Sequence, residues 1–457
     1  MTTSRQLTSQ SLTVVAVICG CFGLYGWAVF ISTFGQDGAI GPHHNGAAGA
    51  DWMAFYAAAR AYFEGNLPLI FEGHRFTEYQ NHLFADWLSA PLPFHPWLYP
   101  PHYLLLVLPF ALLPFGLSYA AFMVVTFAAV VAALWFYVGR GHQRWLQVIS
   151  LAICPAASLN VIAGQNAFLT GALFIGGFGL LARQPVLAGV LLGLLTFKPS
   201  LWLMVPVALI AARQWRALGS ATLTAFLLVL ASLAVFGIEA WRSWLEQAFT
   251  PSSDFLHSWL LAGRLWGQSI YASAWVLGAS YGGANAAQAT ATLLAAITVY
   301  WSFRRRLPAD LQLVILLAAT TLAAPHVSGY DTLLLAIAAT LFFSRALEAD
   351  LPLHHVVPML AAWLCPIFNP PIARAVGLTT PLFIGLMIAS AISCGIFADK
   401  HRVDENGAAA ITAIPRRIDH ALIAALFAVM TGAAALMSMN ASNNYHDIIA
   451  AVLSSGP

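Results

Sequence analysis

Apolar runs separated by short polar segments recur along almost the whole chain, and no other feature limits its fold as strongly. Of the 457 residues, 60% are hydrophobic and only 8% are charged, which is too little charge to cover the surface of a soluble protein. Crossing a bilayer takes about 20 helical residues, and several runs are shorter. We therefore expect an all-α polytopic membrane protein with about 12–14 transmembrane helices, the shorter ones packed within the protein.

The limits of the spans follow from where these runs begin and end. The first run follows Arg5 and is longer than the apolar core of a signal peptide, so we expect it to remain as a membrane helix. Prolines interrupt the apolar stretch 98–115, which favours a re-entrant or interfacial element over a further crossing. The expected spans are 12–34, 116–138, 146–163, 168–182, 186–197, 199–211, 217–237, 285–303, 310–324, 331–345, 354–370, 376–398 and 418–438.

The distribution of Lys and Arg predicts the orientation of these spans, because positive charge accumulates on cytoplasmic connections. With the N-terminus inside, all 20 Lys and Arg residues lie inside except Arg60, Arg75, Lys198, Arg242, Arg264 and Arg374. The chemically rich polar segments then share the outer face of a plasma or inner membrane. They are 35–103, 164–166, 197–199, 238–284 and 325–331, and we expect external juxtamembrane helices in the two long loops.

Asp51 lies at the start of a run in which Trp52, Tyr56 and further aromatic or small residues recur at helical spacing. We expect an amphipathic helix here that lies against the bilayer. Asp51 is a candidate general base, but Asp is also a favoured N-cap residue. The two roles are compatible, because a helix N-terminus favours an ionised carboxylate.

Two further polar positions at span ends could contact a phosphate. Lys198 lies between two apolar runs, and a Lys near membrane depth indicates function; its side chain could instead extend to the interface. His326 follows Pro325, with Tyr330 and Asp331 close behind. It could bind a phosphate or serve only as an interfacial anchor, and Asp331 could cap the next helix.

Weaker signals come from two other outer segments. Gln165 and Asn166 follow Gly164 in what could be a plain turn. The loop 238–284 is rich in Trp and also carries Gln268; it could form an aromatic belt at the interface or cover a saccharide. These alternatives stay open.

A nucleotide or a metal is not indicated. The sequence has no Gly-rich phosphate loop, no paired acidic motif that would hold a nucleotide-bound metal, and no cysteines at metal-ligand spacing. No basic stripe suggests nucleic acid. If a sugar is the substrate, its donor is expected to be carried on a lipid, which can enter sideways from the bilayer.

These segments together resemble glycosyltransferase family 87, the polyprenyl-phosphate-mannose-dependent mannosyltransferases with a GT-C fold. The resemblance covers roughly residues 12–345. No single motif is specific to the family, but their order and spacing together are. They are Ala50-Asp51-Trp52 with Tyr56 and Ala59, Leu98-Tyr99-Pro100-Pro101, Gly164-Gln165-Asn166, Leu187-Ala188-Gly189 with Leu195 to Pro199, and Pro325-His326 with Tyr330-Asp331.

The resemblance implies a GT-C-like helical bundle that transfers a sugar, with mannose expected, from a polyprenyl phosphate to an extracytoplasmic lipid or glycan acceptor. The transfer would invert the anomeric centre, with Asp51 as general base and His326 cooperating with it. Lys198, Arg264 and His326 would hold the departing phosphate, and no metal or other cofactor is implied. The candidate substrate-binding residues are Trp52, Tyr56, Tyr99, Gln165, Asn166, Gln268, Tyr330 and Asp331.

The expected catalytic module is 1–345, and 346–457 would add C-terminal transmembrane helices that resemble nothing specific. The alternative function is a lipid-linked sugar flippase or transporter. Transport favours ionisable residues along the midplane of several spans and repeats between halves, whereas the charges here lie at span ends. A third alternative is a non-catalytic scaffold subunit, which would not need Asp51, Lys198 and His326 on one face.

Overall fold

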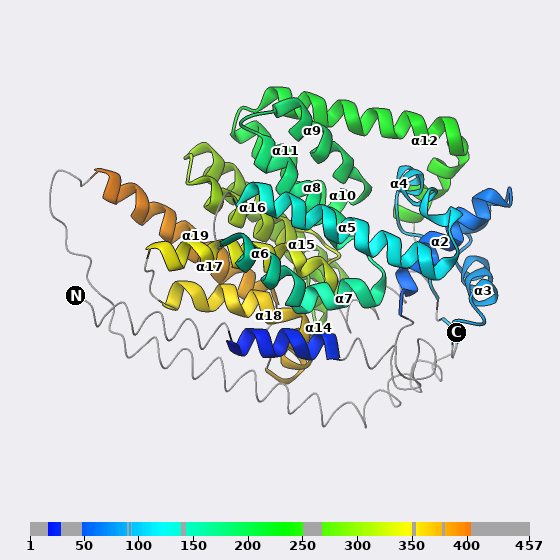
Figure 1. Ribbon diagram of the computed structural model, residues 1–457, viewed down its shortest axis with the longest axis horizontal. Coiled ribbons are helices and arrows are strands. Elements are labelled where there is room, and N and C mark those ends of the chain that lie inside the picture. The colour runs from blue at the N-terminus through cyan, green and yellow to red at the C-terminus, as the bar shows by residue number, and fades with distance from the viewer. Residues whose placement is uncertain are drawn as a thin grey trace.

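The structure is a computed structural model that describes residues 17–28, 48–88, 91–92, 94–138, 143–249, 267–349, 353–376 and 380–403. Within these ranges the chain forms helices joined by short connections and no strand, which confirms the all-α expectation (Figure 1). The expected span 418–438 and the candidate Arg264 lie outside the described residues.

An apolar helix at Val17–Ala28 comes first. The remaining helices, with η for 3-10 helices, follow as α2 (Ala50–Phe63), η1 (Leu67–Phe71), α3 (Gly73–Leu83), α4 (Pro101–Val107), η2 (Phe110–Leu112), α5 (Phe115–Tyr137), α6 (Gln143–Ile153), α7 (Pro155–Ala163), α8 (Ala167–Leu180), α9 (Pro185–Leu194), η3 (Leu195–Phe197), α10 (Pro199–Trp202), α11 (Met204–Ala211), α12 (Trp215–Phe249), α14 (Ile270–Val276), α15 (Tyr281–Arg304), α16 (Ala309–Ala323), η4 (Gly329–Thr332), α17 (Leu333–Ala349), α18 (Leu353–Val376) and α19 (Thr380–Val403).

Each expected span up to residue 398 coincides with a helix or with a broken pair of helices. Among the described residues, α5 and α12 are long and apolar enough to cross a membrane, and α6 with α7, bent by 50°, forms a third such unit. Several other apolar helices are shorter, with 10–17 residues. The protein is therefore an all-α polytopic membrane protein whose short helices are packed within it.

Prolines decide where many of the short helices begin. Pro101, Pro155, Pro185 and Pro199 occupy the first turns of α4, α7, α9 and α10, where the missing N–H has no helical partner to lose. The 7 residues of α4 extend only about 10 Å. The stretch 98–115 thus contains two short helices, α4 and η2, and α4 cannot cross a bilayer.

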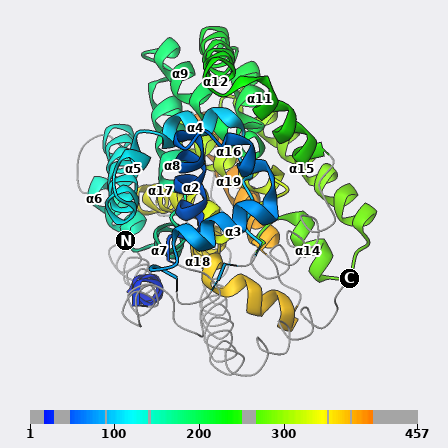
Figure 2. The ribbon, with the colours of Figure 1, turned by 90° about the vertical axis from the view of Figure 1, so that its right-hand side faces the viewer.

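The segment after the first span folds into a compact group of helices at one end of the molecule. Helices α2, α3 and α4 lie together there, in front of the long bundle in Figure 2, and α2 packs against α3, α4, η1 and α7. The expectation of an amphipathic helix against the bilayer was wrong. Residues 52–59 and Ala61 are all buried, so these two turns of α2 are covered on every side.

The expected loop 238–284 is largely helical where it is described. Helix α12 runs on to Phe249 and changes direction at Gly237, whose φ of 80° and ψ of 170° suit only glycine. The segment beyond Gly237 bends back towards α4 and η1 (Figure 1). Residues 250–266 lie outside the described ranges, and α14 and the start of α15 make up most of the rest.

Helix α9 is held very close to α12 by small residues. A Cβ at Gly189 would lie 2.3 Å from the carbonyl oxygen of Ala217, and one at Gly193 would lie 2.6 Å from that of Ala221. Small residues four apart allow such backbone contact between membrane helices. Because η3 and Lys198 directly follow α9, this packing also positions one wall of the cavity described below.

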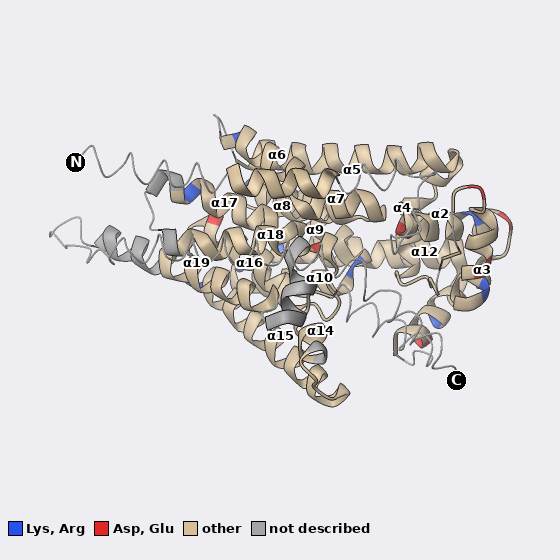
Figure 3. Ribbon diagram, turned by 90° about the horizontal axis from the view of Figure 1, so that it is seen from below, with Lys and Arg blue, Asp and Glu red and all other residues tan. Residues whose placement is uncertain are grey.

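The C-terminal helices continue the same bundle. Helix α18 packs against α17, η4 and α7, and α19 packs against α18 and α16. Near the start of α16, Asp310 accepts a hydrogen bond from Arg345 of α17 at 2.5 Å. Charged residues are sparse along the bundle and more frequent around α3 (Figure 3).

Candidate active site

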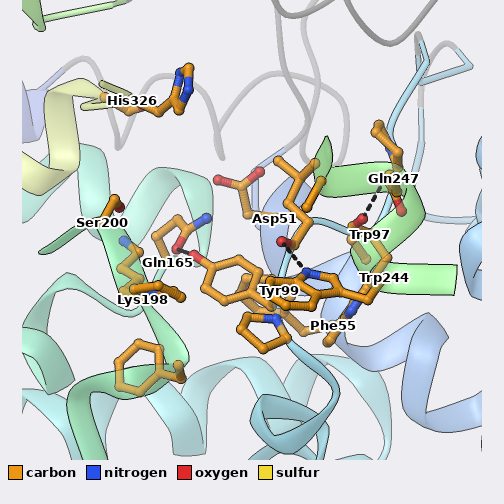
Figure 4. A pocket seen from close by; sticks show the side chains of 18 of the residues that line it. Asp51, Phe55, Trp97, Tyr99, Gln165, Lys198, Ser200, Trp244, Gln247 and His326 are labelled. Atoms are coloured by element: carbon orange, nitrogen blue, oxygen red, sulfur yellow. Dashed lines mark hydrogen bonds between the residues drawn. The ribbon is translucent and has the colours of Figure 1, made fainter. Parts of the chain in front are cut away.

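A cavity of about 420 Å³ lies where α2, the loop 94–100, α10, the end of α12 and the connection after α16 meet. In Figure 4 His326 and Lys198 enter from one side, Trp244 and Gln247 from the other, and Asp51 lies between them. The cavity is lined by Asp51, Ala54, Phe55, Phe94, His95, Pro96, Trp97, Leu98, Tyr99, Pro100, Gln165, Phe197, Lys198, Pro199, Ser200, Trp244, Gln247, Ala248, His326, Ser328, Tyr330 and Asp331.

Asp51 lies in the first turn of α2, and it is not the N-cap residue. That position is taken by Gly49, with a φ of 75° and no side-chain cap. The Gly49 N–H donates to the Ile162 carbonyl at 2.6 Å, and a Cβ on Gly164 would lie 2.7 Å from Trp52 Cβ. This close contact fixes the start of α2 against the end of α7, and Asp51 lines the cavity from there.

His95 contacts Asp51 and was missed by the sequence reasoning. Its Nε2 lies 3.3 Å from Asp51 Oδ1, with side-chain exposures of 23% and 25%. Helix α3 fixes His95 from the side opposite Asp51. The backbone N–H of His95 donates to Thr77 Oγ1 at 2.8 Å, and the ring Nδ1 lies 2.9 Å from Gln80 Oε1. The loop 94–100 has no periodic pattern, so the sequence carries no signal for this contact.

Gln165 is oriented by two hydrogen bonds to its side-chain oxygen. Tyr99 donates its hydroxyl at 3.0 Å, and the Asn166 N–H donates at 3.1 Å. The Gln165 amide nitrogen therefore turns into the cavity, on the side of Asp51 (Figure 4). Gln165 and Tyr99 are thus brought to the same site as Asp51.

Lys198 and Asp331 form an ion pair in the cavity wall, with 2.6 Å between Nζ and Oδ1 and exposures of 11% and 7%. Asp331 Oδ2 also accepts the Ser328 N–H at 3.1 Å, which completes a capping box at η4. Asp331 is therefore not the N-cap residue itself, the role considered for it from the sequence; Ser328 takes that position, and Asp331 lies in the first turn of η4. Lys198 further lies over the Tyr330 ring, 5.4 Å from its centroid.

His326 points into the cavity from the connection between α16 and η4 (Figure 4). Its ring meets the Tyr271 ring edge-on, with centroids 6.1 Å apart. Desolvation by the surrounding protein lowers the pKa of His326. The side chain is exposed to solvent, which makes the lowering of the pKa smaller. A pKa below its usual value of about 6.5 still leaves the ring neutral near pH 7.

Four of the expected substrate-binding residues do not line the cavity. Trp52 stacks on Phe122 in the core, with centroids 4.2 Å apart. The Tyr56 hydroxyl donates to the Leu113 carbonyl at 3.0 Å. Asn166 is fully buried and donates to the Tyr103 hydroxyl at 3.1 Å. Gln268 is buried, with its N–H on the Val327 carbonyl at 2.8 Å and its side-chain oxygen accepting from Thr380.

The bent end of α12 closes one side of the cavity. Gln247 donates to the Trp97 carbonyl at 2.9 Å, and the Trp244 indole donates to the Leu98 carbonyl at 3.3 Å. These bonds hold the loop 94–100 and hence His95. Gln247 was not a sequence candidate, because no pattern in the segment 238–284 places it beside the loop 94–100. Among the described residues, no three His, Cys, Asp or Glu side chains gather as metal ligands would.

A comparison with known protein families matches a part of the chain that includes some of the residues lining the cavity. The model of glycosyltransferase family 87 matches residues 97–325, a range that includes Tyr99, Gln165 and Lys198 and stops one residue before His326. No curated protein and no solved structure matches the chain. Because the match covers half of the sequence, the chain belongs to glycosyltransferase family 87.

Proposed function

We propose that the protein transfers a sugar from a polyprenyl phosphate to a hydroxyl of a lipid or glycan acceptor, with Asp51 as general base and inversion at the anomeric carbon. Family membership supports sugar transfer. The observation that carries the assignment of the site is that Asp51, Lys198 and His326, far apart in the sequence, line one cavity. An acid and two phosphate-binding candidates are the groups that such a transfer needs.

In the proposed step, the acceptor hydroxyl attacks the anomeric carbon while Asp51 takes its proton. The bond from the anomeric carbon to the phosphate oxygen breaks, and the polyprenyl phosphate leaves with the electron pair from the opposite face. General-base catalysis contributes about 10²–10⁴-fold, and holding both substrates in one cavity supplies further rate.

The departing phosphate gains negative charge, and the cavity wall across from Asp51 can stabilise it. The Lys198 ammonium has three N–H donors; Asp331 accepts one at 2.6 Å, which leaves the others for phosphate oxygens. A neutral His326 ring can donate one N–H. Arg264, outside the described residues, remains a further candidate for the same role.

The donor class and the membrane face are part of the proposal. The cavity wall is rich in aromatic side chains, among them Phe55, Trp97 and Tyr99, which suits a lipid carrier and the apolar face of a sugar. A GT-C-like bundle, mannose as the sugar and an extracytoplasmic site in the plasma or inner membrane follow from the resemblance and from the Lys and Arg distribution.

Purified protein incubated with radiolabelled polyprenyl-phosphate-mannose and total membrane lipids tests the proposal. We expect free polyprenyl phosphate together with a labelled new lipid or glycan. Parallel donors that carry glucose or galactose identify the sugar. An intact donor that crosses the bilayer of protein-containing vesicles without any transfer would instead establish the flippase.

A further inference from the structure

Gln80 has only one possible orientation, and this decides where the His95 ring carries its proton. Its side-chain nitrogen donates to two carbonyl oxygens, that of Phe76 at 3.2 Å and that of His95 at 2.8 Å. Its side-chain oxygen therefore faces His95 Nδ1 at 2.9 Å. Gln80 is fully buried, so water does not compete for these bonds.

An amide oxygen can only accept a hydrogen bond, so His95 Nδ1 must carry a hydrogen. In the neutral ring the other nitrogen, Nε2, then has a lone pair. That lone pair points at Asp51 Oδ1, 3.3 Å away. When the Asp51 carboxylate is ionised and the His95 ring is neutral, Oδ1 and Nε2 are both proton acceptors and face each other. One proton can bind between them and form a hydrogen bond.

We propose that His95 takes the proton that Asp51 removes from the acceptor, and that Gln80 keeps His95 Nε2 ready to accept it. His95 acts through Asp51 and is therefore a positioning residue. This inference rests on the proposed function of Asp51 and adds a destination for the proton.

The step balances without a further reactant. The acceptor O–H bond breaks as its oxygen bonds to the anomeric carbon, and the proton joins an Asp51 oxygen. It then passes from Asp51 to His95 Nε2, which leaves a carboxylate beside an imidazolium whose two N–H groups donate to Asp51 and Gln80. Loss of one proton to water in the cavity restores the neutral ring before the next turnover.

The His95 ring lies between two polar side chains. Asp51 of α2 faces the ring on one side and uncharged Gln80 of α3 on the other. The other charged or titratable side chains that line the cavity are Tyr99, Lys198, His326, Tyr330 and Asp331. If Asp51 and His95 already hold a proton before the substrate binds, they cannot readily accept the one from the acceptor hydroxyl. The rate of transfer should therefore fall at acidic pH.

Two substitutions separate proton acceptance from packing. His95→Ala leaves a space that imidazole or pyrazole can fill; the two molecules have the same shape, but pyrazole is a much weaker base. His95→Gln can still donate to Asp51 and cannot take a proton. His82→Gln, on an exposed side chain of the same region outside the cavity, is the matched control.

We expect His95→Ala to lower kcat by about 10–100-fold at an unchanged donor KM, and imidazole but not pyrazole to restore it. In His95→Gln the acidic limb of the pH–rate profile should move to lower pH, because only Asp51 can then hold the proton. Equal rescue by both ring compounds, or full activity of His95→Ala, would overturn the inference. If His95→Ala does not fold, an unmoved acidic limb in His95→Gln would do the same.

The outcome also separates this inference from the proposed function. If His95→Ala is fully active and Asp51→Asn inactive, Asp51 remains the base and only the role of His95 fails. If the wild-type protein transfers no sugar from any polyprenyl-phosphate donor, the proposed function itself fails.

Discussion

The Lys198 ammonium lies 2.6 Å from the Asp331 carboxylate, with both side chains nearly buried at exposures of 11% and 7%. Lys198→Met therefore leaves a buried carboxylate without its partner, which typically costs about 3–5 kcal/mol. We expect a clear fall in the melting temperature of the detergent-solubilised protein.

The double variant Lys198→Met/Asp331→Asn is the control for that prediction. The amide introduced by the second substitution carries no charge, and its oxygen can still accept the Ser328 N–H that Asp331 Oδ2 accepts at 3.1 Å. Much of the lost stability should return. A Lys198→Met protein as stable as the wild type would show that the ion pair is not formed.

The contact between α9 and α12 predicts different effects for the same substitution at two glycines. Gly193→Ala places a Cβ 2.6 Å from the Ala221 carbonyl oxygen, and overpacking of this kind costs about 1–3 kcal/mol. Gly219→Ala in α12 meets nothing within 4 Å and should be neutral or stabilising by up to about 1 kcal/mol. Thermal unfolding compares the two; equal losses would contradict the packing described.

The helix positions could be predicted from the sequence because apolar runs and helix-starting prolines are local signals. Pro185 and Pro199 begin helices where expected spans begin, whereas Pro155 begins α7 in the middle of the expected span 146–163 and breaks it. The loop 238–284 was the exception, since Gly237 lets α12 continue through a change of direction. A glycine in a sequence does not tell a helix end from a kink.

The site was predictable only at positions where a polar residue interrupts apolar sequence, such as Lys198. Trp52 was expected beside the substrate because it shares a motif of the resemblance with Asp51, but adjacent residues on a helix point about 100° apart. Asp51 therefore faces the cavity while Trp52 packs on Phe122. His95 reaches Asp51 through bonds to α3, a tertiary arrangement that leaves no periodic trace in the sequence.

Two stacked tyrosines, with centroids 4.5 Å apart, should differ in their effect on turnover. Tyr99→Phe removes the hydroxyl that orients Gln165 in the cavity, and we expect kcat to fall by about tenfold through misplaced substrate contacts. Tyr103→Phe removes only a bond to buried Asn166 and should leave kcat within about twofold. The comparison uses initial rates; the opposite ranking would contradict the placement of Gln165.

Because His102 is buried as a neutral ring, we expect the folded protein to be less stable to unfolding at acidic pH. Its side chain is 7% exposed and its Nδ1 has no hydrogen-bond partner among the described residues. Desolvation lowers its pKa from 6.5 to about 4. Between these values the unfolded chain binds a proton that the folded protein does not, so the free energy of unfolding falls as the pH falls, by up to about 3 kcal/mol.

His102→Phe removes this proton and keeps an aromatic ring beside Trp241, which His102 stacks on with centroids 5.8 Å apart. Melting temperatures of the two proteins, recorded from pH 7 to pH 4, should converge or cross as the pH falls. Curves that stay parallel would show that His102 does not contribute.

The role of Asp51 is tested most directly by the initial rate at which Asp51→Asn releases polyprenyl phosphate from polyprenyl-phosphate-mannose in the presence of the acceptor. The substitution keeps the size of the side chain in the first turn of α2 and removes its ability to accept a proton. We predict a rate lower by about 10²–10⁴-fold with donor affinity and melting temperature close to those of the wild type. An Asp51→Asn protein that releases polyprenyl phosphate at the wild-type rate would contradict the assignment of Asp51 as the base.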